Sequence, residues 1–245
     1  AQYRPYNSRW LDGWHGWRDF GTGNLGNWAS HTMNLPFKAL RLDALWNQQA
    51  GVPAKRLVKL VPEVSGVHQY SFPKWEIIRY DFPARGDMPP VRINWYNGPG
   101  QAPGPRDMIE QMIGRRLDWG DAGEKKWADH SGCLLMGDKG MIHSTGHNMS
   151  FTLLPQNKFR DFEGPPRSLP RTRGHEQEWL DACKGGPAPM SSFDYADPLA
   201  EFVLLGNVAT LVGEAIEFDP LEMKIVNNPR GDAALHREYR QGWSL

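Results

Sequence analysis

The chain has 245 residues, of which 40% are apolar and 23% are charged. This is ordinary usage for a globular protein that buries a sizeable core, and it excludes disorder on a large scale. Lys plus Arg and Asp plus Glu number 28 each, so electrostatic attraction gives no case for a nucleic-acid partner or an anionic membrane. No apolar run reaches membrane-spanning length.

The N-terminal part is expected to be an irregular arm followed by two helices. Residues 1–24 are rich in Trp and Gly and show no period. Residues 25–33 have a helical pattern, and Pro36 can open a second short helix through Leu42. The first residue is Ala1 rather than Met, so we expect a processed chain or a piece of a longer one.

The rest of the chain alternates short strands with helices. The turn-rich residues 83–90 predict an antiparallel hairpin between the strands on either side, and residues 137–140 predict a tight turn. The expected strands are residues 56–64, 75–82, 91–96, 134–136, 141–143, 151–154, 215–218 and 223–226. The expected helices are residues 107–117, 175–184, 194–212 and 233–240. Consecutive strands followed by helices predict an α+β fold, in which one domain over residues 1–245 has an open, mainly antiparallel β-sheet with helices packed on one face.

Residues 21–26, GTGNLG, match the pattern G-x-G-x-x-G. In a dinucleotide-binding fold this turn follows a buried strand and opens a helix, so that backbone N–H groups face the pyrophosphate. Here the preceding residues 11–20 are LDGWHGWRDF, which is not a buried strand, and Pro36 cuts the following helix short. We therefore expect no nucleotide-binding domain in this chain.

The same helix carries a candidate acid/base residue. Asn27 and His31 are four residues apart and share one helix face. Because an imidazole titrates near neutral pH, this pair could orient and deprotonate a substrate hydroxyl in a Trp-rich pocket. The alternative is a histidine held only by structural hydrogen bonds. The 11 Trp residues also allow two interpretations: they could stack on sugar rings, or they could fill the core.

Six segments, in the same order, resemble the C-terminal domain of the Gfo/Idh/MocA oxidoreductases, in a subgroup common in planctomycete-type bacteria. They are WRDFGTGNLGNWASHTMNLPFKAL, PKWEIIRYDFPARGDMPPVRINWY, SGCLLMGDKG, GHEQEWLDACKGG, FDYADPLAEFVLLGNVA and EYRQGW. In that family an N-terminal Rossmann domain binds NAD or NADP and supplies a catalytic Lys. The C-terminal domain completes the sugar or cyclitol site and usually forms the oligomer interface. The family's Asp-x-x-x-His motif implies that His31 is the acid/base, with Asn27 at the Asp position.

The resemblance implies the substrate-binding and oligomerising domain of an NAD(P)-dependent sugar or cyclitol oxidoreductase. Its Rossmann domain would come from the same gene or from a separate chain, and without it we expect no cofactor binding. A homo-oligomer would form through the open sheet face. Further substrate-binding candidates, placed upstream of His31 or in matching motifs, are Trp17, Arg18, Asp19, Lys74 and His175.

Two other functions stay open at this point. One is a non-catalytic carbohydrate-binding or assembly protein on the same scaffold, and the other is a cofactor-independent sugar lyase or hydrolase. Cys133 and Cys183 are far apart and lack metal-ligand neighbours, so we expect buried free thiols and no metal site. The compartment, bacterial cytoplasm or periplasm, is not predicted.

Overall fold

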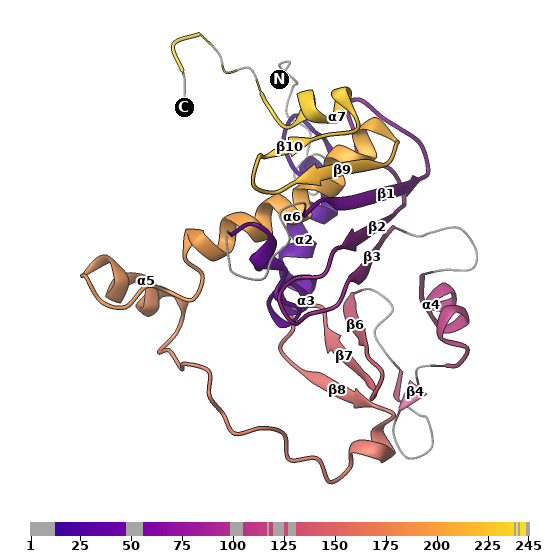
Figure 1. Ribbon diagram of the computed structural model, residues 1–245, viewed down its shortest axis with the longest axis vertical. Helices are drawn as coiled ribbons and strands as arrows, with labels where there is room; N and C mark the ends of the chain where they lie inside the picture. The colour runs from indigo at the N-terminus through magenta and orange to yellow at the C-terminus, as the bar shows by residue number, and fades with distance from the viewer. Residues whose placement is uncertain are drawn as a thin grey trace.

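A five-stranded antiparallel sheet organises the computed structural model, which describes residues 13–47, 56–98, 105–116, 118–119, 125–126, 131–237, 239 and 241–243. The strand order is β10-β9-β1-β2-β3 (Figure 1). The strands are β1 (Val58–Val64), β2 (Glu76–Phe82), β3 (Val91–Asn97), β9 (Ile216–Asp219) and β10 (Lys224–Ile225). The predicted hairpin is confirmed, because β2 pairs with β3 in antiparallel register.

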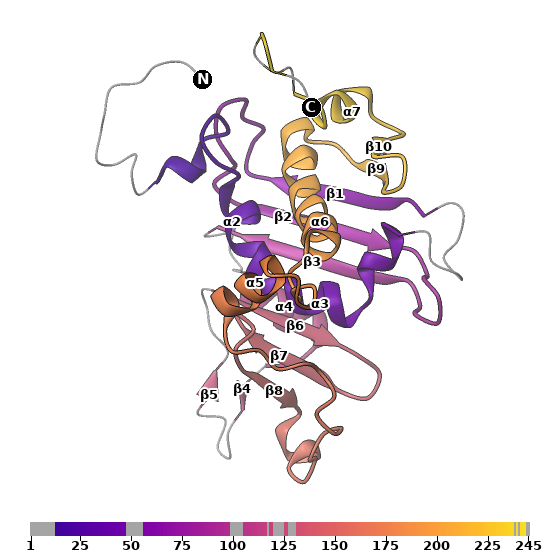
Figure 2. The same ribbon diagram turned by 90° about the vertical axis from the view of Figure 1, so that its left-hand side faces the viewer.

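Helices cover one face of this sheet, which confirms the predicted α+β architecture. Figures 1 and 2 show α2 (Gly23–Thr32), α3 (Asn34–Ala39) and α6 (Phe193–Val212) on the same side of the strands. Strand β2 shows why, since its residues alternate between buried and half-buried and successive side chains of a strand point to opposite faces. The buried set meets Leu25, Phe37 and Phe202 in the core.

Helix α6 packs closely on α2 because its sequence has a glycine at the contact. A Cβ atom at Gly206 would lie 2.3 Å from both Leu25 Cδ2 and the Tyr80 hydroxyl oxygen. The helix ends at Gly213, whose φ of 70° is in the left-handed region and whose N–H bonds to the Ala209 carbonyl. Gly206 therefore sets how near α6 comes to α2 and the sheet.

A second, three-stranded sheet has the order β6-β7-β8. Its strands are β6 (Gly132–Met136), β7 (Met141–Thr145) and β8 (Phe151–Leu154). The predicted tight turn between the first two is present, with the Gly137 N–H bonded to the Gly140 carbonyl at 2.9 Å. Met141 and Leu154 form a small core with Ile109 and Ile113 of α4 (Pro105–Ile113). Short elements complete the chain: η1 (Trp14–Gly16), η2 (Leu42–Leu45), β4 (Asp118–Trp119), β5 (Lys125–Lys126) and η3 (Gln156–Phe159).

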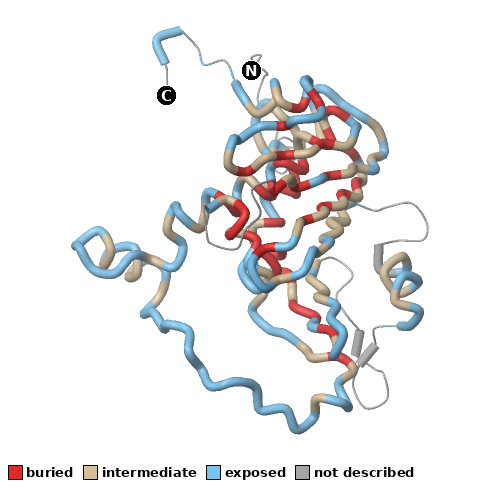
Figure 3. Tube along the Cα trace, in the orientation of Figure 1, coloured by how far each residue is buried: buried red, intermediate tan, exposed pale blue. Residues whose placement is uncertain are grey.

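Two C-terminal elements differ in how well they are supported by packing. Helix α5 (His175–Cys183) has no buried residue and stands out from the body, at the end of a largely exposed segment (Figure 3). Helix α7 (Pro229–Ala234) begins earlier than the predicted helix at residues 233–240. The Asn228 side chain accepts a hydrogen bond from the Gly231 N–H and Pro229 follows it, which is a strong helix start.

Three smaller predictions have mixed outcomes. Both cysteines are free thiols, but only Cys133 is partly buried and Cys183 is exposed, so the expected burial of Cys183 is wrong. Of the expected N-terminal arm, residues 1–12 lie outside the described residues, and residues 13–24 contain η1 and the start of α2. Among the described helices, none is long and apolar enough to cross a membrane.

Candidate functional site

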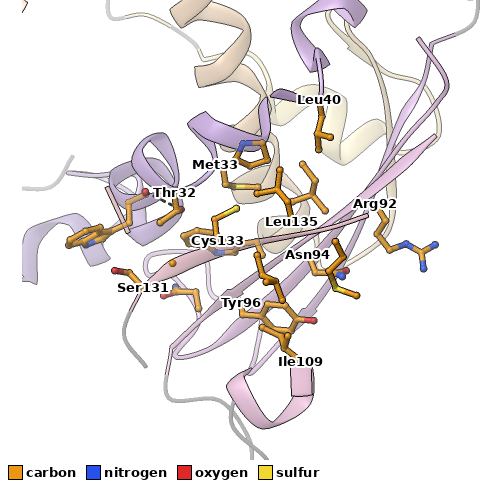
Figure 4. A pocket seen from close by; sticks show the side chains of 18 of the residues that line it. Thr32, Met33, Leu40, Arg92, Asn94, Tyr96, Ile109, Ser131, Cys133 and Leu135 are labelled. Carbon is orange, nitrogen blue, oxygen red and sulfur yellow. Dashed lines mark hydrogen bonds between the residues drawn. The ribbon is translucent and has the colours of Figure 1, made fainter. Parts of the chain in front are cut away.

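A cavity of about 540 Å³ lies between the edge strands of the two sheets, β3 and β6 (Figure 4). Helices α2 and α3 form one wall, and Ile109 and Met112 of α4 contribute to another. The cavity is within the size range that takes a small-molecule ligand. Its lining includes two indole rings, Trp28 and Trp95, and amide side chains at Asn24, Asn94 and Asn97.

A buried carboxylate fixes the polar side chains at one end of this cavity. Glu76, at the start of β2, accepts hydrogen bonds on Oε1 from Trp95 Nε1 at 3.1 Å and from Asn97 Nδ2 at 3.3 Å. Asn97 Oδ1 in turn accepts from Asn24 Nδ2 at 3.0 Å. Burial raises the pKa of Glu76, while the two hydrogen bonds and the charge of Arg18 act in the opposite direction. The indole of Trp95 and two amides are thereby held in fixed orientations.

His31 is exposed on α2 and belongs to an aromatic cluster at the rim of the cavity. Its ring centroid lies 5.9 Å from that of Trp28 and 4.8 Å from that of His147. The rings of Trp28 and His147 are 5.2 Å apart. Since Trp28 lines the cavity, both imidazoles pack against one of its walls.

His147 is a site residue that the sequence analysis missed. It lies in the turn between β7 and β8, and the neighbouring residue Asn148 links this turn to α2 by a hydrogen bond. Asn148 Nδ2 donates to the His31 carbonyl oxygen, and its Oδ1 accepts from Ser144 Oγ at 3.0 Å. The backbone of Asn148 has a φ of 54°, which Asn tolerates better than most residues. No local pattern links His147 to His31, because the contact is purely tertiary.

The predicted residues Asn27 and His31 lie together on α2, and both are exposed. Arg18 lies elsewhere, since its guanidinium joins the N-terminal segment to α6. It donates from Nε to the His68 carbonyl at 3.1 Å, makes a long hydrogen bond of 3.4 Å to Thr210 Oγ1, and lies 4.4 Å from the centre of the Phe72 ring. Burial lowers the pKa of Arg18 and the nearby Glu76 carboxylate raises it. Arg18 is not among the residues that line the cavity.

The other predicted substrate contacts are dispersed. Trp17 forms an isolated β-bridge with Ser71. Asp19 and Lys74 are exposed. His175 begins α5, which Figure 1 places well away from β3 and β6. The structure therefore places His31 against Trp28 at the cavity rim, leaves Asn27 exposed on the same helix, and does not bring His175 there.

Residues 21–26 lack a preceding strand, as the sequence predicts. They follow the 3₁₀ helix η1 and a turn, not a strand. The glycines serve close packing, since a Cβ at Gly26 would lie 2.1 Å from Thr22 Oγ1, and one at Gly23, with φ of +65°, 2.9 Å from Phe72 Cγ. This turn therefore lacks the strand–turn–helix context that a pyrophosphate cradle needs.

Two further chemistries are not favoured by the site. Burial raises the pKa of the Cys133 thiol, which lines the cavity, to about 12, so it stays protonated and weakly nucleophilic near neutral pH. In the part of the chain that the structure describes, no group of three or more His, Cys, Asp or Glu side chains could hold a metal ion.

No protein-family model matches this chain, and comparison with curated proteins gives no significant match. Indole faces, amides and rim imidazoles form a set that can hold a polyhydroxylated ring and move a proton at one of its hydroxyl groups.

Proposed function

We propose that this chain is the substrate-binding and oligomerising domain of an NAD(P)-dependent sugar or cyclitol oxidoreductase. The cavity between α2, β3 and β6 holds the sugar. The observation that carries the proposal is the convergence of Trp28, Trp95, Asn24 and Asn97 on one cavity, with His31 at its rim. Amides donate to and accept from hydroxyl groups, and an indole face covers the C–H face of a ring.

In the complete enzyme, His31 accepts the proton of the hydroxyl that is being oxidised. Asn27 helps to orient the imidazole, although an amide cannot stabilise an imidazolium by charge as a carboxylate would. A Rossmann domain would hold NAD or NADP, which would supply the hydride-accepting chemistry that this chain's own residues lack. Trp17, Arg18, Asp19, Lys74 and His175 stay predictions as substrate contacts.

Mutation of His31 in the complete enzyme tests this role. His31→Ala should lower turnover by roughly 10²-fold or more, which is the usual contribution of a general base. Because His31 is exposed, the melting temperature should change little. His236→Ala, at another exposed histidine, is the matched control and should keep full turnover. Normal turnover together with a lower melting temperature for His31→Ala would contradict the proposal.

A non-catalytic sugar-binding protein is the second candidate, and Asn27 is the observation that favours it, because the family motif has Asp there. In that case His31→Ala would weaken sugar binding with no turnover to lose. A lyase or hydrolase is less well supported, since no Asp or Glu is among the described residues that line the cavity and such chemistry commonly uses a pair of carboxyl groups.

A further inference from the structure

The cavity has almost no charge of its own. Arg92 is the single charged side chain among the described lining residues. Its Nε already donates to Asp81 Oδ1 at 2.5 Å, and the side chain is largely exposed. Binding a phosphate or carboxylate group requires unpaired cations or converging N–H donors, because desolvating an anion is otherwise costly. The lining therefore favours an uncharged ligand.

The cavity is also polarised along its length. The Asn24–Asn97 hydrogen bond places the start of α2 beside the end of β3. Gly132 pairs with Thr145 at the end of β7, and the turn that follows carries His147 to Trp28. The start of β6 therefore lies beside the second half of α2, near Trp28 and His31. The cavity lining there includes polar side chains from α2, β3 and the residue before β6, namely Asn24, Asn97 and Ser131.

Apolar side chains predominate towards the opposite end, where Figure 4 also shows Asn94 and Arg92. Figure 4 shows Leu40 and Leu135 displaced along the cavity from Thr32 and Ser131. The apolar side chains of the lining include Met33, Pro36, Leu40, Ile93, Leu135 and Met112. A free hexose would leave these side chains against water, whereas a larger ligand with an apolar part would bury them. A cavity of about 540 Å³ has room for such a ligand, because pockets that take drug-sized molecules measure about 300–1,000 Å³.

We infer that the ligand is an uncharged amphipathic glycoside. This inference rests on the proposed sugar site and narrows the class of substrate that the site takes. The sugar ring lies at the end formed by Asn24, Trp28 and Asn97. The apolar aglycone lies between α3, Ile93 and Leu135. No charged group of the ligand is needed for recognition.

Calorimetric titration of the chain with matched sugar derivatives tests this inference. The probes are the 4-nitrophenyl and methyl β-glycosides of glucose, galactose, mannose and xylose, together with glucose 6-phosphate and free 4-nitrophenol. For at least one sugar, the 4-nitrophenyl glycoside should bind at least ten-fold more tightly than the methyl glycoside, because its ring buries apolar surface. Glucose 6-phosphate should bind more weakly than methyl glucoside.

Variants at the two ends should separate the two contributions. Leu135→Gln should remove most of the ten-fold advantage of the nitrophenyl glycoside. Met112→Gln, at a largely exposed residue of the lining, should reduce the advantage without risk to folding. Ile142→Gln is the control, because Ile142 pairs with Leu135 but does not line the cavity. Trp28→Ala should weaken methyl and nitrophenyl glycosides by the same factor.

The outcomes distinguish this inference from the proposed function. Equal affinity for methyl and nitrophenyl glycosides, or tighter binding of glucose 6-phosphate, would overturn the inference and leave the sugar site standing. Binding of free 4-nitrophenol as tight as that of any glycoside would contradict both, because the sugar would then contribute nothing. Absence of binding by every probe would likewise count against both.

Discussion

Glu76 places a carboxyl group in the protein interior, with one oxygen bonded and the other without a hydrogen-bond partner. Its side chain is only 2% exposed. Burial is the main reason that its pKa is raised. Burying this carboxyl has an energetic cost, and its hydrogen bonds fix the orientation of Trp95 and Asn97.

The pH dependence of stability should reveal this carboxyl. The pKa of Glu76 is higher in the folded state than in the unfolded state, so the folded protein binds more protons between the two values, and stability falls as the pH rises through that window. Glu76→Gln has no proton to lose and can keep both hydrogen bonds on its amide oxygen. Its melting temperature should exceed that of the wild type at pH 8, and the difference should shrink as the pH falls towards 5.

Glu63→Gln, at an exposed residue of β1, is the control for thermal melts across the same pH range. A Glu76→Gln difference that stays constant with pH, or a lower melting temperature at pH 8, would show that Glu76 contributes chiefly as a hydrogen-bond acceptor.

For single residues, the sequence predicts which side chains share one face of a helix, but not which side chains meet across separate elements. The four-residue spacing places Asn27 and His31 on α2 because a helix brings residues four apart to one face. His147 is not predictable in this way, since its approach depends on the Asn148 bond to α2. Arg18 has a motif position that indicates substrate binding, yet its guanidinium contacts α6.

At the scale of elements, the close contact between α2 and α6 depends on Gly206, which has no Cβ atom. Gly206→Ala would place a Cβ 2.3 Å from Leu25 Cδ2 and from the Tyr80 hydroxyl. Both neighbours are fully buried and have little room to move. We expect a loss of about 1–3 kcal/mol in the free energy of unfolding, as is usual for overpacking.

Urea denaturation measures this loss. Gly16→Ala is a suitable control, because a Cβ there meets nothing within 4 Å, and it should leave the midpoint nearly unchanged. If Gly206→Ala is as stable as the wild type, α6 can shift away from α2 at little cost, and the cavity wall is less rigid than the packing implies.

Periodicity predicted most strands and helices to within a few residues, since each pattern is local. The exception is α7, where the Asn228 cap and Pro229 determine the start more strongly than the apolar pattern further along. The cavity was not predictable, because β3 and β6 are separated by α4 and more than thirty residues of chain. Nothing local in either strand shows that their edges face one another.

At the scale of the whole molecule, the sheet register decides what the open face presents. Ile93 pairs with Tyr80 and Trp95 with Ile78, so both side chains point to the helix-covered face. The open face carries Ile77 among charged neighbours, with Asp81 bonded to Arg79 and Arg92. A face of mixed charge with a small apolar centre can pair with a second copy of itself.

We expect the protein to self-associate through this face at tens of micromolar, the concentration range of a weak to moderate complex. Ile77→Asp should shift the sedimentation coefficient to that of a monomer. Ile142→Asp, on the separate three-stranded sheet, should not. A wild-type protein that sediments as a monomer at these concentrations would contradict the proposed interface.

The most direct test of the sugar site is an NMR titration of the isotope-labelled chain with a panel of neutral sugars, glycosides and cyclitols. If the cavity between α2, β3 and β6 is the site, at least one member should shift the indole N–H signals of Trp28 and Trp95 and the ring signals of His31, in a saturable manner that Trp28→Ala abolishes. Shifts confined to exposed residues far from the cavity, such as Trp179 on α5, or no shifts with any member of the panel, would contradict the assignment of this cavity as a sugar site.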